Sequence, residues 1–184
     1  MDEEVTIIDS NTRNEKIKNF LINNKKNLIV GFFIILVVII GCLSVIQMKE
    51  RNKIKLANQF NITTINFKTE TKQKTIDQLT KLINENDPTY SPLALYFLID
   101  NNLINNKIKI NSLFDGIINK TNLDEEIKNL IIYKKALFNS DFSTENDLLQ
   151  ILNPIINSES IWKSHSLYLM AEYFYSKDQK QKAK

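Results

Sequence analysis

The sequence predicts an all-α protein in which one transmembrane helix near the N-terminus is followed by antiparallel helical hairpins. Three observations lead to this fold class. One uncharged apolar run is long enough to cross a bilayer, the apolar residues after it recur with the period of a helix, and clusters of Asn, Asp, Ser and Pro separate these helical blocks. We therefore divide the chain into an N-terminal tail at 1–27, a transmembrane helix at 28–48 and a helical domain at 49–184.

The transmembrane prediction rests on residues 28–46, which carry no charge and consist mainly of Leu, Ile, Val and Phe. As a helix this run is about 28 Å long, close to the thickness of a bilayer core. A cleaved signal peptide is one alternative, but its apolar core would be shorter and would end in small residues. A lipoprotein is another, because residues 39–42 loosely fit a lipid-attachment box, although 43–46 stay apolar after Cys42. We favour a span in which Cys42 acts as a small apolar side chain.

Basic residues flank both ends of the run, so the positive-inside rule does not fix its orientation. They are Arg13, Lys16, Lys18, Lys25 and Lys26 before it, and Lys49, Arg51, Lys53 and Lys55 after it. In the tail, Thr12 and Glu15 have the spacing of a capping box, which predicts a helix start. Ile17, Phe20 and Leu21 then form an apolar stripe. This segment either lies on the membrane surface or simply extends the transmembrane helix.

Beyond the run we expect the membrane helix to continue outward to about residue 65, although 62–65 are rich in β-branched residues. A second helix follows at 76–83. A third opens at Ser91, as N-cap, with Pro92 in the first helical position. The third helix is apolar on nearly all sides, which indicates a central position.

Four more helices are expected. Residues 110–118 carry apolar side chains at helical spacing, and the next helix starts at 124–126, where three acidic residues suit the positive end of its dipole. We interpret those acids as a solvated first turn. The sixth helix spans 144–153, where Pro154 stops or kinks it, and the seventh spans about 160–175.

These helices are expected to pair into hairpins with turns near 105–106, 140–141 and 177–178. The turns recur about 35 to 38 residues apart, close to the 34-residue tetratricopeptide period. In the last hairpin Ala171 and Ala183 would let two helices approach closely. Residues 179–184 would begin the second helix of that hairpin, so we expect either that the sequence is truncated or that another chain covers the seventh helix.

The composition speaks against a catalytic or cofactor-binding role. His165 is the only histidine, Cys42 is the only cysteine, and the three glycines form no phosphate-binding loop. The net charge of +3 comes from interspersed charges rather than from a basic stripe. We therefore expect no enzyme, no cofactor, no metal ion and no nucleic-acid partner.

One face of the seventh helix is the candidate binding site. His165, Tyr168, Glu172 and Tyr175 recur at helical spacing, opposite a stripe that contains Trp162, Leu169 and Met170. In a tetratricopeptide register these positions face a groove, and aromatic with charged side chains suit a peptide ligand. The alternative is that they pack against a neighbouring helix.

The order of these features resembles a bacterial family, the tetratricopeptide-like ancillary subunit of the SecYEG translocon and its relatives. The resemblance consists of a tail that is acidic and then basic, one span after residues 25–27, and helical hairpins. Its most specific stretch is 154–184, with Pro154, Trp162, Ala171, Asp178 and Ala183 at comparable places. The chain departs from typical members in carrying Ile, Leu and Phe where they favour Ala.

The resemblance implies a single-pass protein of the bacterial inner membrane with a cytoplasmic N-terminus and a periplasmic repeat domain. It would act as an adapter beside SecYEG and periplasmic chaperones, and it would contact nascent exported polypeptides. Two alternatives stay open: a scaffold of the same fold that faces the cytoplasm, and a non-catalytic subunit of a membrane enzyme complex.

Overall fold

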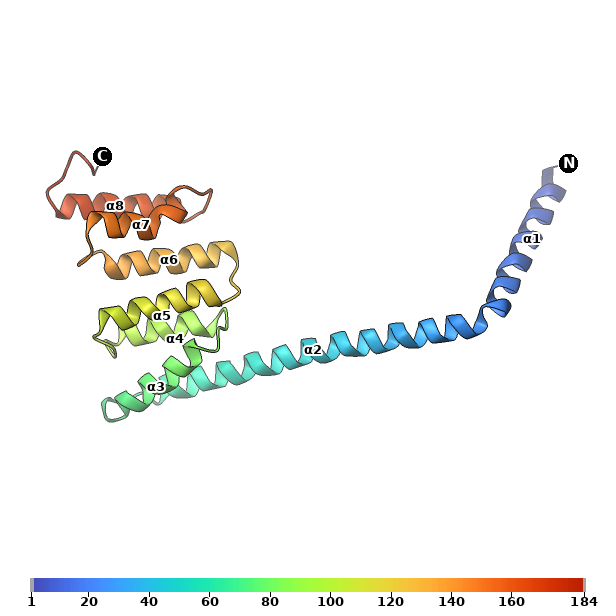
Figure 1. Cartoon of the computed structure of the whole chain (residues 1–184), viewed down its shortest axis with the longest axis horizontal. Coiled ribbons are helices and arrows are strands. Elements are labelled where there is room, and N and C mark those ends of the chain that lie inside the picture. The colour runs from blue at the N-terminus through green and yellow to red at the C-terminus, as the bar shows by residue number, and fades with distance from the viewer. Residues whose placement is uncertain (1, 184) are drawn as a thin grey trace. The chain divides into compact units, whose positions relative to one another are not determined.

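The computed structural model describes residues 2–183, with side chains from residue 13 onward, and these residues are helical with no strand among them (Figure 1). The all-α prediction is therefore confirmed for this part of the chain. The chain divides into two units, residues 1–52 and 53–184.

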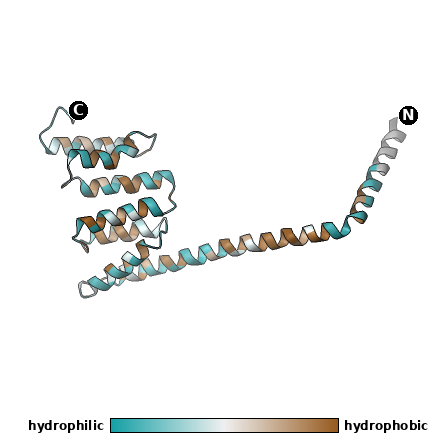
Figure 2. Ribbon diagram, in the orientation of Figure 1, coloured by the Kyte–Doolittle hydropathy of each residue, from teal (hydrophilic) through white to brown (hydrophobic). Residues whose placement is uncertain are grey.

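The first unit consists of α1 (Asp2–Asn23) and most of α2 (Lys25–Ile65), with Asn24 as a single turn residue between them. Figure 2 shows the continuous apolar stretch of α2. Among the described residues, α2 is the one helix long and apolar enough to cross a membrane. The predicted helix start at Thr12 is wrong, because α1 already begins at Asp2 and Thr12 lies inside it.

As expected, α2 continues as one helix beyond the apolar run. The last part of α2 belongs to the second unit, where Leu56 and Thr63 are buried and Phe60 packs on the core. The β-branched residues at 62–65 do not end the helix early, because the packing of neighbouring side chains outweighs their lower helix propensity.

Six further α-helices complete the second unit, and from α4 onward each packs on the one before it in the chain. In addition, α6 contacts α8, two helices further along. Their bounds are α3 (Lys72–Ile83), α4 (Tyr90–Asp100), α5 (Lys107–Lys120), α6 (Glu125–Asn139), α7 (Glu145–Ile156) and α8 (Lys163–Ser176), with a short 3₁₀ turn η1 (Thr69–Thr71) before α3.

The core of the second unit has two clusters. The first joins α3, α4 and α5 and contains Leu79, Leu95, Leu98 and Phe114, all almost fully buried. The second joins α6, α7 and α8 around Leu148, Leu152, Ile155 and Met170. The sequence predicts a central position for α4. In the structure α4 is not buried on all sides, since Leu93 is 40% exposed.

The start of α4 differs from the prediction. Ser91 is not the N-cap but lies within the helix, fully buried, where its hydroxyl donates to the Leu82 carbonyl at 3.3 Å. The Asp87 carboxylate instead accepts hydrogen bonds from the backbone N–H groups of Thr89 and Tyr90, at 2.9 and 2.8 Å. The Asp87 carboxylate thus pairs the backbone donors of the N-cap residue Thr89 and of the first helical residue Tyr90, and the helix begins before Pro92.

The end of α7 also differs. Pro154 lies inside the helix, which runs two residues further to Ile156. A proline in the last turn removes one backbone donor but need not end the helix, because few carbonyls remain to be paired there. The start of α7 agrees with the prediction, and Thr144 forms a capping box with Asp147.

The C-terminal stretch is the third difference. Residues 179–183 form turns rather than the first part of a helix. Asp178, with φ of 59°, reverses the chain after α8, and the Gln179 N–H donates to the Phe174 carbonyl at 2.9 Å. The expected turn at 177–178 is therefore present, and the expected helix after it is not.

Candidate partner-binding surface

Helix α8 is held on the second core cluster by one face. Leu169, Met170, Tyr173 and Phe174 are buried there, and the Tyr173 hydroxyl donates to the Ser143 carbonyl at 3.1 Å, in the turn between α6 and α7. These buried residues share one side of the helix, so the opposite side faces outward. Tyr168 lies on that outer face.

Three of the four predicted site residues come together on the outer face. Tyr168, Glu172 and Tyr175 line a hollow of about 420 Å³, whose remaining lining residues are Ala171, Ser176 and Ala183. Tyr168 and Tyr175 are 64% and 66% exposed, so both rings are available to a partner. We call this the α8 surface, defined by Tyr168, Glu172 and Tyr175.

The electrostatics of the α8 surface centre on Glu172. Side-chain hydrogen bonding to Glu172 and the negative charge of its carboxylate raise the pKa of Tyr168 above its ordinary value of 10.0. The two side chains are one helical turn apart. The surface therefore offers a partner an acidic group between two aromatic rings.

His165 lies apart from the hollow. It packs beside the rings of Trp162 and Tyr133, with centroids 5.3 and 6.1 Å from its own, and Tyr133 stacks on Trp162 at 5.8 Å. This aromatic cluster joins α6 to the start of α8. His165 is exposed and does not line the hollow.

Turns at 179–183 help to shape the hollow. Lys182 forms an ion pair with Glu145 at 2.8 Å, and its ammonium group lies 5.3 Å from the centre of the Phe174 ring. These contacts hold Ala183 near Ala171, and both alanines line the hollow. The close approach of two helices that the sequence predicted at these alanines is not found, because residues 179–183 form turns.

A second hollow was not expected from the sequence. It has a volume of about 260 Å³, and its lining comes from α4, α5 and α6, with Tyr96, Phe114, Lys134 and Phe138 among its residues. The Tyr96 hydroxyl is buried without a hydrogen-bond partner among the described residues, and burial raises its pKa to about 12. The only sequence signal was a phenol inside the apolar run 93–99.

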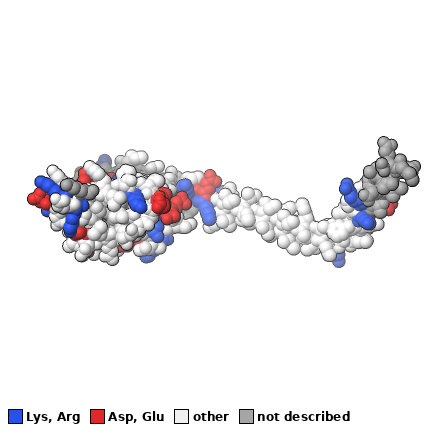
Figure 3. All heavy atoms as spheres, turned by 90° about the horizontal axis from the view of Figure 1, so that it is seen from above, with Lys and Arg blue, Asp and Glu red and all other residues white. Residues whose placement is uncertain are grey.

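The sequence predicts a solvated first turn at the acidic start of α6. In the structure this turn is only partly solvated. Glu126 is half-buried and accepts a hydrogen bond of 2.8 Å from the Ser160 hydroxyl, whose oxygen accepts from the Trp162 N–H at 3.1 Å. Glu126 thereby positions the loop that leads into α8. Elsewhere, Figure 3 shows charges of both signs interspersed over the helical domain.

Comparisons with protein-family models, with curated proteins and with solved structures found no match to this chain. Within the described residues, no three His, Cys, Asp or Glu side chains are grouped closely enough to hold a metal ion.

Proposed function

We propose that this chain is a membrane-anchored adapter, in which α2 crosses the bilayer and the helical domain binds polypeptide partners. The observation that carries the proposal is the α8 surface, where Tyr168 and Tyr175 are about two-thirds exposed beside a hollow. Tyrosine is enriched at protein interfaces because its ring buries a large area while its hydroxyl keeps a hydrogen bond. Exposed aromatic pairs at a hollow are typical of such surfaces.

Two features of the packing support a tetratricopeptide-like arrangement. Consecutive helices of the second unit pack on one another, and α6 also contacts α8, as expected where each hairpin stacks on the next. The turns at 140–141 and 177–178 recur at a spacing close to the 34-residue tetratricopeptide period. Together with the resemblance described above, this favours a protein-interaction scaffold.

The same resemblance suggests the partners and the location. In this proposal the N-terminus is cytoplasmic, the helical domain is periplasmic, and the α8 surface contacts the SecYEG translocon, periplasmic chaperones or exported polypeptides as they emerge. The chain contributes binding rather than catalysis, and it needs no cofactor. The lipid bilayer is its other partner, through residues 28–46.

The test places a photo-reactive phenylalanine analogue at Tyr175 of the full chain in a bacterial host. A matched control places it at Ile108, which is 82% exposed on α5, a helix that packs on α4 and α6. We expect adducts with translocon or chaperone subunits from position 175 and not from 108. Tyr168→Ala and Glu172→Gln, introduced together, should reduce those adducts. Equal adducts from both positions would contradict the α8 surface as the binding site.

Topology separates this proposal from the two alternatives. Protease added to intact spheroplasts should digest the helical domain and leave an N-terminal tag protected. Protection of the domain until the cells are lysed would instead favour a scaffold facing the cytoplasm. Co-purification with the subunits of a membrane enzyme, and not with the export machinery, would favour a non-catalytic subunit of a membrane enzyme complex.

A further inference from the structure

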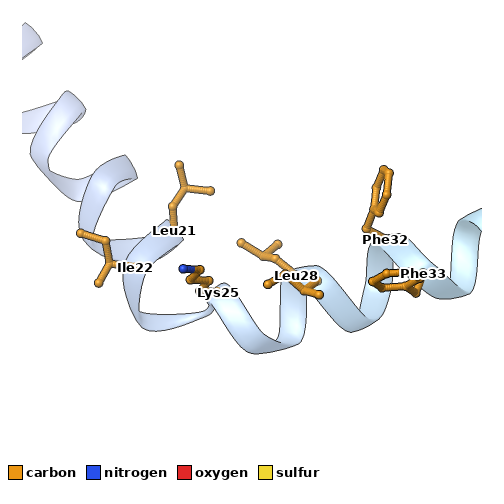
Figure 4. A pocket seen from close by; sticks show the side chains of 7 residues that line it. Leu21, Ile22, Lys25, Leu28, Phe32 and Phe33 are labelled. Atoms are coloured by element: carbon orange, nitrogen blue, oxygen red, sulfur yellow. The ribbon is translucent and has the colours of Figure 1, made fainter.

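The bend between α1 and α2 carries an apolar hollow with one basic side chain in it. The hollow is lined by Leu21, Ile22, Lys25, Leu28, Ile29, Phe32 and Phe33. Figure 4 shows the Lys25 amine between the leucines of the two helices, with Leu21 and Phe32 projecting to the same side. The spacing of 21, 25, 28 and 32 is that of one helix face. A single face therefore continues across Asn24.

The depth of Lys25 relative to the span is the second observation. Lys25 precedes the apolar run at Leu28 by three residues, which is about 4.5 Å along a helix. If α2 spans the bilayer, this places the Lys25 ammonium at the level of the lipid phosphates, while Phe32 and Phe33 lie within the hydrocarbon. The hollow thus offers a cationic top and an apolar base, which matches the two halves of a phospholipid.

Charge is the third observation. Residues 13–27 contain five basic side chains against the single acid Glu15. Figure 3 shows basic groups where α1 meets the uncharged span. Lys18 lies seven residues before Lys25 and so shares its side of the helix. Ile17, Phe20 and Leu21 are at least half exposed beside them. A surface that is both basic and apolar is complementary to an anionic membrane surface.

We infer that the hollow at the bend of α1 and α2 is a binding site for an anionic phospholipid. Lys25, assisted by Lys18, binds the headgroup phosphate, and Leu28, Ile29 and Phe32 contact the acyl chains. The apolar stripe of α1 lies in the interface beside that lipid. The inference rests on the proposed membrane span, since only a bilayer brings lipids to the hollow.

The test measures how strongly spin-labelled phosphatidylglycerol and phosphatidylcholine associate with the full chain in phosphatidylcholine bilayers. We expect a several-fold preference of the native chain for phosphatidylglycerol. Lys25→Gln should reduce that preference by up to about five-fold, the effect of one basic residue at an anionic surface. Inorganic phosphate at constant ionic strength should not compete, because the site also needs the acyl chains.

Two matched controls separate a site from general surface charge. Lys26→Gln removes the same charge at nearly the same depth, but Lys26 does not line the hollow. Lys49→Gln removes a charge three residues beyond the other end of the run, at Ile46. Both variants should keep most of the preference. Equal association of the two lipids with the native chain, or an equal loss in Lys25→Gln and Lys26→Gln, would overturn the inference.

Membrane insertion is measured on the same samples by extraction with alkaline carbonate. A native chain that is extracted would contradict the proposed anchor itself. A chain that stays inserted but shows no lipid preference would contradict only the lipid site.

Discussion

Asn111 on α5 and Asn139 on α6 exchange two side-chain hydrogen bonds, of 2.9 and 2.8 Å, between their amide groups. Each amide also donates to the backbone carbonyl four residues earlier in its own helix, Lys107 and Lys135 respectively. All four amide hydrogens are therefore used. The pair joins the two core clusters through a polar contact that fixes how α5 and α6 lie side by side.

Replacing one member of this pair should destabilise the helical domain. Asn139 is buried, so Asn139→Ala leaves the Asn111 amide without its partner and should lower the free energy of unfolding by about 1 to 3 kcal/mol. Urea unfolding of the full chain in detergent, followed by the fluorescence of Trp162, measures this. Asn119→Ala, at an exposed position of α5, is the control and should change it by less than about 0.5 kcal/mol. A matching loss in both variants would contradict the role of the pair.

The cap of α4 leads to a second prediction. Asp87→Ala removes the acceptor of two backbone N–H groups and should cost about 1 kcal/mol of unfolding free energy. Asp87→Asn keeps the acceptor oxygen and should retain most of the stability. The same urea assay measures both. Asp141→Ala, at an exposed turn position, is the control for loss of a carboxylate. No difference between Asp87→Ala and Asp141→Ala would show that Asp87 does not cap α4.

The case of Asp87 also shows what the sequence could and could not predict. The apolar periodicity located every helix of the second unit to within a few residues, because burial of one face is the dominant energy in such helices. The choice between Asp87 and Ser91 as the cap depends on where each side chain points once α3 and α4 are packed. Ser91 faces the Leu82 carbonyl in the core, and that is a tertiary contact.

The candidate site was predicted in part for the same reason. Helical spacing placed Tyr168, Glu172 and Tyr175 on one face, and spacing alone was sufficient for that. Helical spacing could not show that His165 lies apart from these three residues. His165 packs beside Tyr133 of α6, and this neighbour is set by the tertiary contact of α6 with α8. The Tyr96 hollow was missed because its lining comes from α4, α5 and α6, whose side chains meet there only once the three helices are packed.

Tyr96→Phe should stabilise the domain, and more so in alkali. The Tyr96 hydroxyl is buried without a partner among the described residues, so its removal should add about 1 kcal/mol at neutral pH. The folded state raises the pKa of Tyr96 from 10.0 to about 12 and holds the proton more tightly than the unfolded chain. The contribution of this proton is therefore fully present below pH 10 and is lost as the pH rises from 10 through 12.

Urea unfolding at pH 7 and at pH 11 tests this. The advantage of Tyr96→Phe over the native chain should be larger at pH 11. Tyr175→Phe, at an exposed tyrosine, should leave the unfolding free energy at pH 7 within about 0.5 kcal/mol of the native value. A Tyr96→Phe variant less stable than the native chain would mean that the hydroxyl does have a partner.

Helix ends in this chain use Asn and Asp where glycine is more usual, and Asn102 is the clearest case. Its φ is 50°, a left-handed conformation that Asn tolerates better than Ala. The N–H groups of Asn102 and Leu103 donate to the carbonyls of Ile99 and Leu98, both at 2.9 Å. Asn102→Ala should therefore cost about 1 kcal/mol, whereas Asn102→Gly should not. Urea unfolding measures the free energy of unfolding of both variants. An Ala variant as stable as the Gly variant would contradict the left-handed conformation of Asn102.

Glu172 raises the pKa of Tyr168, and this relationship gives a direct probe of the α8 surface. In Glu172→Gln the negative charge is removed, so the pKa of Tyr168 should fall toward its ordinary value of 10.0. A titration of the tyrosine ring carbons by NMR, assigned with Tyr168→Phe, measures the shift. Glu159→Gln, which removes an acidic group from the exposed loop before α8, is the control and should leave that pKa unchanged. A Tyr168 titration that is the same with and without Glu172 would show that the two side chains do not interact on the surface proposed to bind partners.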